Sequence, residues 1–125
     1  MKVLIIDDSA MDRKMIMSTI SKSDLTPEFL EAEDGEDGMR VLSENRSDIK
    51  LILLDWQMPR MDGLEFMRGV VKVPEVSGIP IVMVTASGSA DSKKIAYAVN
   101  PNLAGYVVKP YKPDDIVETI RPYLK

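Results

Sequence analysis

The sequence predicts an α/β protein built on a parallel sheet of five strands, doubly wound with helices on both faces. Two observations predict this fold class: five short apolar runs lie along the chain, and amphipathic segments separate them. This alternation is typical of parallel strands joined by right-handed helical crossovers. The length of 125 residues suits one domain, and no repeat or linker is visible, so we expect a single domain over residues 1–125.

The five apolar runs differ in how deeply their strands should be buried. Residues 3–6, 51–54 and 81–84 are continuous apolar runs, as expected for strands covered on both faces. Residues 105–108 form a shorter run of the same kind. Residues 29–32 are more polar, which predicts a strand at the edge of the sheet.

The first two amphipathic segments begin with helix-start signals. Residues 9–23 start at Ser9, a candidate N-cap that is followed three residues later by Asp12, a carboxylate variant of the capping box. Apolar side chains at helical spacing then mark one face of this segment. Residues 36–45 follow an Asp-Gly pair and predict a second helix.

Prolines punctuate the other three predicted helices. The third covers residues 64–73 and should end before Pro74, and the fourth covers residues 90–99 and should stop before Pro101. Pro113 suits the first position of a fifth helix, which we expect to run to the end of the sequence.

The composition excludes several kinds of chemistry. The chain has no Cys and no His, so it offers no disulfide, no thiolate nucleophile and no imidazole ligand. A metal ion would need carboxylates, carbonyls and water, which are the ligands of Mg²⁺, Mn²⁺ or Ca²⁺. The net charge of −4 has the wrong sign for unaided nucleic-acid binding. No apolar run approaches the roughly 20 residues that span a bilayer, so we expect no membrane contact. The absence of Cys suits the cytosol, and we expect a cytoplasmic protein.

Polar residues follow four of the predicted strands. They are Asp7 and Asp8 after the first apolar run, Asp55 after the third, Thr85 after the fourth and Lys109 after the fifth. Singly, each has an ordinary structural explanation as a turn residue, a helix cap, a strand residue or a solvated lysine. Because ligands of open parallel sheets bind at the carboxyl ends of the strands, we expect these side chains to meet.

Such a group of side chains suits phosphoryl transfer. Three crowded carboxylates repel one another unless they share a cation, and Mg²⁺ takes oxygen ligands while keeping water for a phosphate to displace. An Asp can act as a nucleophile and form an aspartyl-phosphate. A lysine such as Lys109 can neutralise the phosphoryl oxygens, and the Thr85 hydroxyl can donate a hydrogen bond to one of them.

The chain resembles the receiver domain of two-component response regulators over essentially its whole length. The resemblance is carried by the strand-end residues and two continuous stretches: Asp7-Asp8, Asp55, Thr85, Lys109-Pro110, and residues 55–66 and 105–110. Both stretches are close to the chemotaxis (CheY-like) single-domain form. The resemblance implies a flavodoxin-like fold with strand order 2-1-3-4-5, and a phosphoryl acceptor in two-component signal transduction rather than a conventional enzyme.

The resemblance also implies the roles of the acidic residues. Asp55 would accept a phosphoryl group from the phosphohistidine of a sensor histidine kinase. Asp8 and Asp55 would ligate Mg²⁺, or Mn²⁺ in its place, together with the backbone carbonyl of Gln57. Asp7 would act on the metal through a bound water.

The remaining implied roles concern the switch. Lys109 would pair with the phosphoryl group, and the bond from Lys109 to Pro110 would be cis. Thr85 would move toward the phosphate, and Tyr106 would change its rotamer behind it. A downstream protein would then bind the face formed by the fourth helix, the fifth strand and the fifth helix, and we expect a monomer.

Other functions stay open at this point. The chain could be the receiver of a larger transcriptional regulator or of a hybrid kinase, or a receiver that survives only as a binding module. A Mg²⁺-dependent phosphatase that forms an aspartyl-phosphate is a further alternative. Such enzymes have two Asp residues separated by one other residue after the first strand, whereas Asp7 and Asp8 are adjacent and Ser9 follows them. The chain departs from the receiver pattern at Asn100-Pro101, next to the expected partner face.

Overall fold

The computed structural model describes residues 1–124 and confirms the predicted fold class. All strand pairs are parallel, and the sheet has the order β2-β1-β3-β4-β5. The strands are β1 (Lys2–Ile6), β2 (Glu28–Ala32), β3 (Ile49–Leu54), β4 (Ile81–Thr85) and β5 (Gly105–Val108). The more polar β2 therefore lies at one edge, as its composition predicts, and the short β5 lies at the other.

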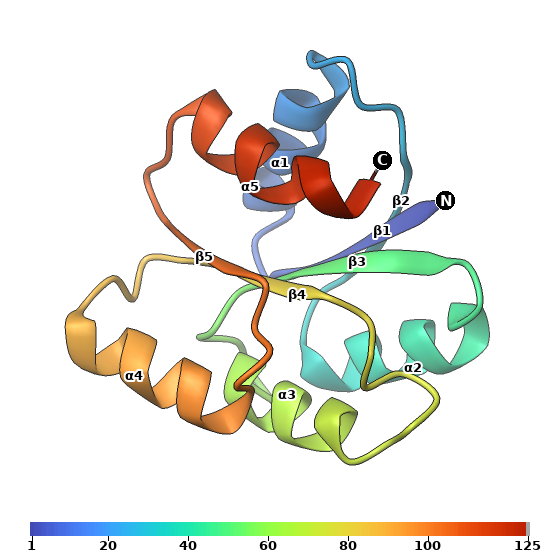
Figure 1. Cartoon of the computed structure of the whole chain (residues 1–125), viewed down its shortest axis with the longest axis vertical. Coiled ribbons are helices and arrows are strands. Elements are labelled where there is room, and N and C mark those ends of the chain that lie inside the picture. Colours follow the sequence, from blue (N-terminus) through green and yellow to red (C-terminus); the bar gives the residue numbers. More distant parts are fainter. Residues whose placement is uncertain (125) are drawn as a thin grey trace.

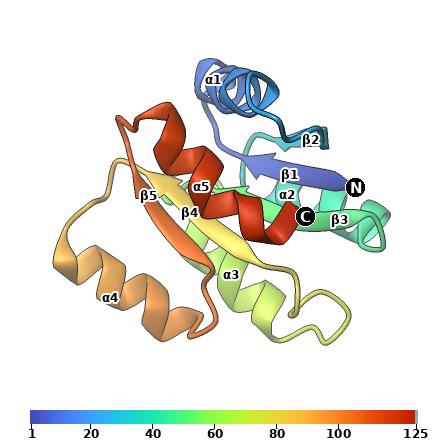
Figure 2. The ribbon, with the colours of Figure 1, turned by 45° about the horizontal axis from the view of Figure 1, so that its top comes forward.

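Five helices cover the two faces of the sheet. They are α1 (Ala10–Ser21), α2 (Gly35–Asn45), α3 (Gly63–Val71), α4 (Ala90–Val99) and α5 (Pro113–Leu124). Helices α1 and α5 lie together on one face, and α2, α3 and α4 cover the other (Figure 1). Figure 2 shows α5 beside α1, with which it is in contact. None of the helices in residues 1–124 is long and apolar enough to cross a membrane.

Each face of the sheet has its own apolar core. Residues of β1, β3 and β4 alternate between the two cores, as the period of a strand requires. On the side of α2, α3 and α4 the core includes Leu42, Phe66 and Ala96, and on the other side it includes Ile16 and Ile116. Because both faces are covered, the polar groups of the sheet gather at its ends rather than on its faces.

Side-chain caps fix where the first four helices begin. Ser9 accepts a hydrogen bond from the backbone N–H of Asp12 at 3.2 Å, which confirms the predicted cap of α1. Asp34, Asp62 and Ser89 cap α2, α3 and α4 in the same way. Each cap directly follows the loop that leaves the carboxyl end of a strand, so it also fixes the end of that loop.

Three predicted boundaries were wrong by two residues each. The first helix ends at Ser21 rather than residue 23, and the third at Val71 rather than residue 73. Strand β3 begins at Ile49, two residues before the continuous apolar run. Ile49 is buried but Lys50 beside it is exposed, so the start of this strand alternates and does not read as an apolar run.

Candidate functional site

The register of the strands brings the predicted residues to one end of the sheet. Ile6 of β1 pairs with Leu54 of β3, so the residues that follow them become neighbours. The backbone N–H of Asp55 donates to the carbonyl of Ile6 at 2.9 Å. On the other side of β3, the backbone N–H of Lys109 donates to the carbonyl of Thr85 at 2.9 Å.

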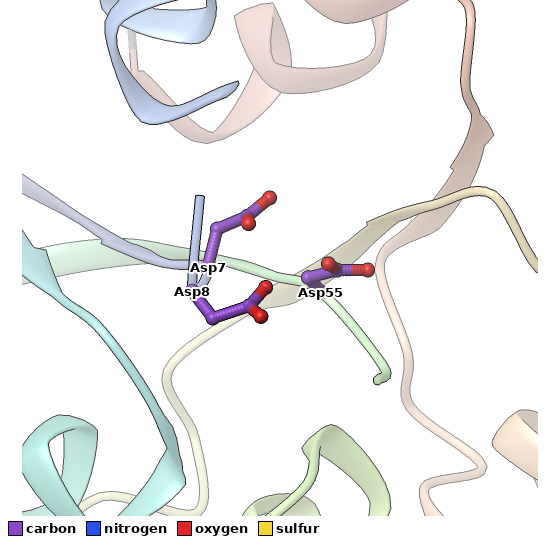
Figure 3. Close-up of side chains that lie close together, drawn as sticks. All are labelled: Asp7, Asp8 and Asp55. Carbon is purple, nitrogen blue, oxygen red and sulfur yellow. The ribbon is translucent and has the colours of Figure 1, made fainter. Parts of the chain in front are cut away.

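The carboxylates of Asp7, Asp8 and Asp55 form a cluster. One oxygen of each lies within 4.8 Å of the others, and Figure 3 shows the side chains emerging side by side from the ends of β1 and β3. Asp7 is buried, Asp8 is exposed and Asp55 is half-buried. Three anionic oxygen donors at this separation repel one another and match the ligands of a hard divalent cation such as Mg²⁺ or Mn²⁺.

The Lys109 ammonium group lies between the acidic side chains. Its Nζ is 2.7 Å from Oδ2 of Asp7, 2.9 Å from Oδ2 of Asp12 and 3.6 Å from Oδ2 of Asp55. Burial by itself would lower the pKa of Lys109, but its hydrogen bonds to Asp7 and Asp12 and the Asp55 charge raise it above its ordinary value. Lys109 is therefore a fixed positive charge beside the cluster.

Asp7 is held rigidly by three separate contacts. Burial raises its pKa above the ordinary value, although hydrogen bonds from Lys109 and from the backbone N–H of Ser9 act in the opposite direction. The Ser9 bond measures 2.9 Å to Oδ1 of Asp7. Nη1 of Arg13 donates to the backbone carbonyl of Asp7 at 2.6 Å, while its Nε is paired with Glu31 at 2.9 Å.

Neutral side chains lie on the other side of Asp55. Thr85 is buried at the end of β4, and its Oγ1 accepts from the backbone N–H of Ser87 at 3.2 Å. The hydroxyl of the half-buried Tyr106 donates to the carbonyl of Ser87. Burial, and then the charge of Asp55, raise the pKa of Tyr106. Lys93 of α4 lies over its ring, 5.8 Å from the centroid.

The loop between β3 and α3 is anchored by hydrogen bonds to the side chain of Asp55 and to the backbone of Trp56. The N–H of Trp56 donates to Oδ1 of Asp55 at 2.8 Å, and the N–H of Gly63 donates to the carbonyl of Trp56 at 2.8 Å. A Cβ on Gly63 would lie 2.3 Å from the Asp55 carbonyl oxygen, so only glycine permits this close approach. Gln57 lies in this loop and is exposed.

The profile of the response regulator receiver domain matches residues 3–121. The chain belongs to this family. A receiver is a phosphoryl acceptor rather than a conventional enzyme, and receivers take the phosphoryl group from histidine kinases. This chain is thus the receiver of a two-component response regulator with a pocket of three Asp residues.

Two curated relatives show how broad the family is. The receiver is 33% identical over 124 residues to a chemotaxis protein CheY homolog of Campylobacter jejuni, covering 99% of this chain and 92% of the relative. It is also 33% identical over 123 residues to the phosphate regulon transcriptional regulatory protein PhoB of Pseudomonas aeruginosa, covering 98% of this chain but 51% of the relative.

Two solved structures have the same fold. The chemotaxis protein CheY4 of Vibrio cholerae superposes with a TM-score of 0.84 at 31% identity, covering 98% of each chain. The Mn²⁺-bound form of response regulator Rcp1 superposes with a TM-score of 0.78 at 25% identity, covering 97% of this chain and 89% of the other. The acidic cluster of this receiver fits a metal site of the same kind.

The structure brings together most of the predicted site residues. Asp7, Asp8, Asp55 and Lys109 form one contiguous group, and Thr85 adjoins it through the backbone of Lys109. The bond between Lys109 and Pro110 is cis, as the resemblance implies. The exposed Gln57 and the half-buried Tyr106 lie further out, in the loop after β3 and on β5.

Two contacts of the receiver site were not predicted. Asp12 was interpreted only as part of a helix start, yet it forms an ion pair with Lys109. Arg13 had no predicted role, yet it reaches back to the carbonyl of Asp7. Both residues lie in the first turn of α1, and the one available clue was that this turn directly follows Asp7 and Asp8 in the sequence.

A second set of unpredicted contacts connects the loop after Asp55 to the start of α2. Arg60 has a φ of 65°, and among residues 1–124 it is the non-glycine residue with a positive φ. Its Nε donates to Oδ2 of Asp34 at 2.7 Å, and Asp34 is only 1% exposed. Burial would raise the pKa of Asp34, but hydrogen bonds from the Asp37 backbone and from Arg60 lower it below its ordinary value. The backbone of Gly35 adds a bond to the carbonyl of Met61 at 2.8 Å.

Proposed function

We propose that this receiver is a chemotaxis-type response regulator that accepts a phosphoryl group on Asp55 and thereby changes its binding of a downstream protein. The observation that carries the proposal is the position of Asp55. Its carboxylate adjoins two other acidic side chains on one side and lies 3.6 Å from the Lys109 ammonium group. This arrangement provides a nucleophile, a metal-binding cluster and a fixed positive charge at one point.

The transfer step needs no other catalytic residue of this chain. A carboxylate oxygen of Asp55 attacks the phosphorus of a phosphohistidine, the P–O bond forms and the P–N bond breaks. The donor histidine leaves with the electron pair of that bond and takes up a proton. Lys109 neutralises charge on the transferred phosphoryl oxygens, so that positioning and electrostatics supply most of the catalysis.

Asp8, Asp55 and the backbone carbonyl of Gln57 are the proposed ligands of Mg²⁺, and Asp7 would act through a bound water. The cluster offers oxygen donors only, which suits Mg²⁺ and admits Mn²⁺. The bound cation would reduce the repulsion among the carboxylates and neutralise the phosphoryl oxygens. The part of this chain is to hold the carboxylates at the correct separation.

The switch would use the neutral side chains beyond Asp55. A phosphoryl group adds negative charge and acceptor oxygens. The Thr85 hydroxyl accepts one hydrogen bond from Ser87 and can donate another, so a phosphoryl oxygen is a suitable new partner. Movement of Thr85 and the loop after it would release the carbonyl of Ser87 from Tyr106.

The proposed output surface is the face of α4, β5 and α5. Helix α4 leaves Ile95 and Tyr97 exposed by 46% and 40%, and Tyr106 on β5 connects this face to Ser87 near the site. Exposed apolar side chains of this kind support binding of another protein. Asn100 ends α4 with its side chain turned to the backbone N–H of Asn102, so the unusual Asn100-Pro101 turn shapes the end of the same face.

Chemotaxis is favoured because the Campylobacter relative at 33% identity and the Vibrio structure at 31% identity are both chemotaxis proteins. PhoB is also 33% identical to this chain. A receiver of a larger transcriptional regulator is therefore the second candidate. Phosphoryl transfer from a purified chemotaxis kinase of the source organism, compared with transfer from a kinase of a phosphate-type system, would separate the two. Faster transfer from the chemotaxis kinase is the expected result.

The phosphoryl acceptor is tested by intact mass. After incubation with Mg²⁺ and a small phosphodonor, we expect the protein to gain the mass of one phosphoryl group, whereas the Asp55→Asn variant should gain none. Omission of Mg²⁺ should also abolish the gain. A phosphorylated Asp55→Asn variant, or an unmodified wild type that is folded and binds Mg²⁺, would contradict the assignment.

A further inference from the structure

The Lys109 ammonium group has three N–H donors, and carboxylates already occupy two of them. Asp7 and Asp12 accept at 2.7 and 2.9 Å, whereas Asp55, the proposed acceptor, is 3.6 Å away. The lysine is therefore bound more closely to two other acids than to the residue that it is proposed to serve.

Asp7 and Asp12 differ in what a metal ion would do to them. Asp7 belongs to the cluster of carboxylates within 4.8 Å of one another, so a bound cation would compensate its charge. Asp12 is outside that cluster in the described residues and keeps its full attraction for the lysine. With the metal in place, Asp12 is the uncompensated carboxylate in contact with Lys109.

Asp12 is also held in position by the start of α1. Its backbone N–H donates to Oγ of Ser9, and it lies in the first turn, where a carboxylate is favoured by the helix dipole. Its side chain is 37% exposed, whereas that of Lys109 is 17% exposed. The Asp12 carboxylate can therefore turn to solvent when the lysine leaves it, next to a hollow of about 390 Å³ that both residues line.

We propose that Asp12 competes with the phosphoryl group for Lys109 and so lowers the affinity of the site for that group. The inference rests on the proposed function, because it concerns the lysine of the same site. The third N–H donor of Lys109 is available to a phosphoryl oxygen, but the hydrogen bond to Asp12 at 2.9 Å holds the ammonium group 3.6 Å from Asp55. The Asp12 carboxylate also repels the incoming negative charge. Asp12 thus helps to set how tightly the site binds a phosphoryl group and how readily the switch occurs.

Beryllium fluoride with saturating Mg²⁺ is the probe, because it imitates a phosphoryl group on a carboxylate without a covalent step. Fluorine NMR observes the bound species directly. We expect Asp12→Asn to bind the probe about threefold to tenfold more tightly than the wild type. Asp12→Glu keeps a carboxylate that can reach the lysine and should stay close to the wild type.

The matched control is Asp114→Asn. It removes the same charge from an exposed position in the first turn of α5, and it should change the affinity by less than about twofold. Urea unfolding of Asp12→Asn without Mg²⁺ should show only a small loss of stability, because the variant loses a half-exposed ion pair but keeps the Ser9 cap, which contacts the backbone. Tighter binding of the probe by a variant that is no more stable than the wild type separates competition for Lys109 from a general stabilisation of the fold.

The possible failures are distinct. Equal or weaker binding by Asp12→Asn, or an equal gain in Asp114→Asn, would overturn the role of Asp12 while leaving the proposed function intact. No Mg²⁺-dependent bound species in the wild type would instead overturn the proposed function itself.

Discussion

The two sides of Asp55 are built differently. On the side of β1 and α1, charged groups are locked together: Lys109 pairs with Asp7 and Asp12, and Arg13 holds the backbone of Asp7. On the side of β4, Thr85 and Tyr106 are held by single hydrogen bonds to the backbone of Ser87. A network of ion pairs is costly to disrupt, whereas a neutral hydrogen bond is worth only about 1 kcal/mol net.

The difference separates two tasks within one small site. The charged side keeps the acceptor and the metal ligands in place, as positioning for phosphoryl transfer requires. The neutral side can exchange its partners at little cost in free energy, as a two-state switch requires. Variants on the charged side should therefore change folding stability and affinity together, and variants on the neutral side should change mainly the switch.

Lys109→Ala should have the largest effect on stability. It leaves the buried carboxylate of Asp7 beside Asp55 with no ammonium group, so we expect the free energy of unfolding to fall by about 1–3 kcal/mol without Mg²⁺. Mg²⁺ should restore part of the loss, because a cation replaces the missing charge. Urea unfolding with and without Mg²⁺ measures both changes. Lys112→Ala, an exposed lysine of the same loop, is the control and should be nearly neutral.

Arg60→Gly tests an ion pair that lies outside the site. Glycine adopts the φ of 65° without strain, so this variant removes the guanidinium group and keeps the backbone. We expect it to be less stable than the wild type at pH 7, because the buried Asp34 loses its partner. It should still bind beryllium fluoride.

The loss of folding stability in Arg60→Gly should depend on pH. The pKa of Asp34 is lower in the folded protein than its ordinary value of 3.8. The contribution of the Asp34 carboxylate to the free energy of unfolding is therefore complete above pH 3.8 and is lost as pH falls through the folded pKa. The stability difference between wild type and variant should therefore shrink in acid. Urea unfolding between pH 7 and pH 3 measures it, and a difference that stays constant would contradict the assigned pair.

Thr85→Val should separate stability from switching. It removes the hydroxyl at nearly constant volume and loses the bond from the backbone of Ser87, so we expect a loss of about 1 kcal/mol in the free energy of unfolding. Mg²⁺ affinity should be unchanged. Amide NMR shifts of α4 and β5 on addition of beryllium fluoride should be reduced, and full-sized shifts would show that Thr85 is not part of the switch.

Tyr106→Phe should have the smallest effect on stability. It deletes one hydroxyl whose partner, the carbonyl of Ser87, lies in the loop after β4, and we expect a loss of about 0.5 kcal/mol. The resting conformation of that loop should become less populated. A stability loss as large as that of Lys109→Ala would contradict the contrast between the two sides.

Most of the fold was predictable from local patterns. The apolar runs mark the sheet because each buried strand must be apolar on both faces, and Ser9 marks the start of α1 because a cap must be a short polar side chain. The exception at Ile49 and Lys50 has the same physical origin, since a strand that begins half-exposed reads as alternating. The polar residues of β2 predicted its position at the edge of the sheet. Strand β5 lies at the other edge but is more apolar, so its polarity did not predict that position.

The candidate site was predictable only in part. Asp7, Asp55 and Lys109 directly follow strands, so the topology alone places them at one end of the sheet. Asp12 and Arg60 reach their partners across separate elements, Lys109 after β5 and Asp34 before α2. Such contacts depend on side-chain reach and on the orientation of a helix against a loop, and neither leaves a local pattern in the sequence.

A crystal structure with Mg²⁺ and beryllium fluoride tests the contrast most directly. We predict that the bonds from Ser9 and Arg13 to Asp7 stay as they are, while Thr85 turns to the phosphoryl mimic and Tyr106 leaves the carbonyl of Ser87. An unchanged neutral side together with broken contacts of Arg13 and Asp7 would contradict the division of the site into a fixed half and a moving half.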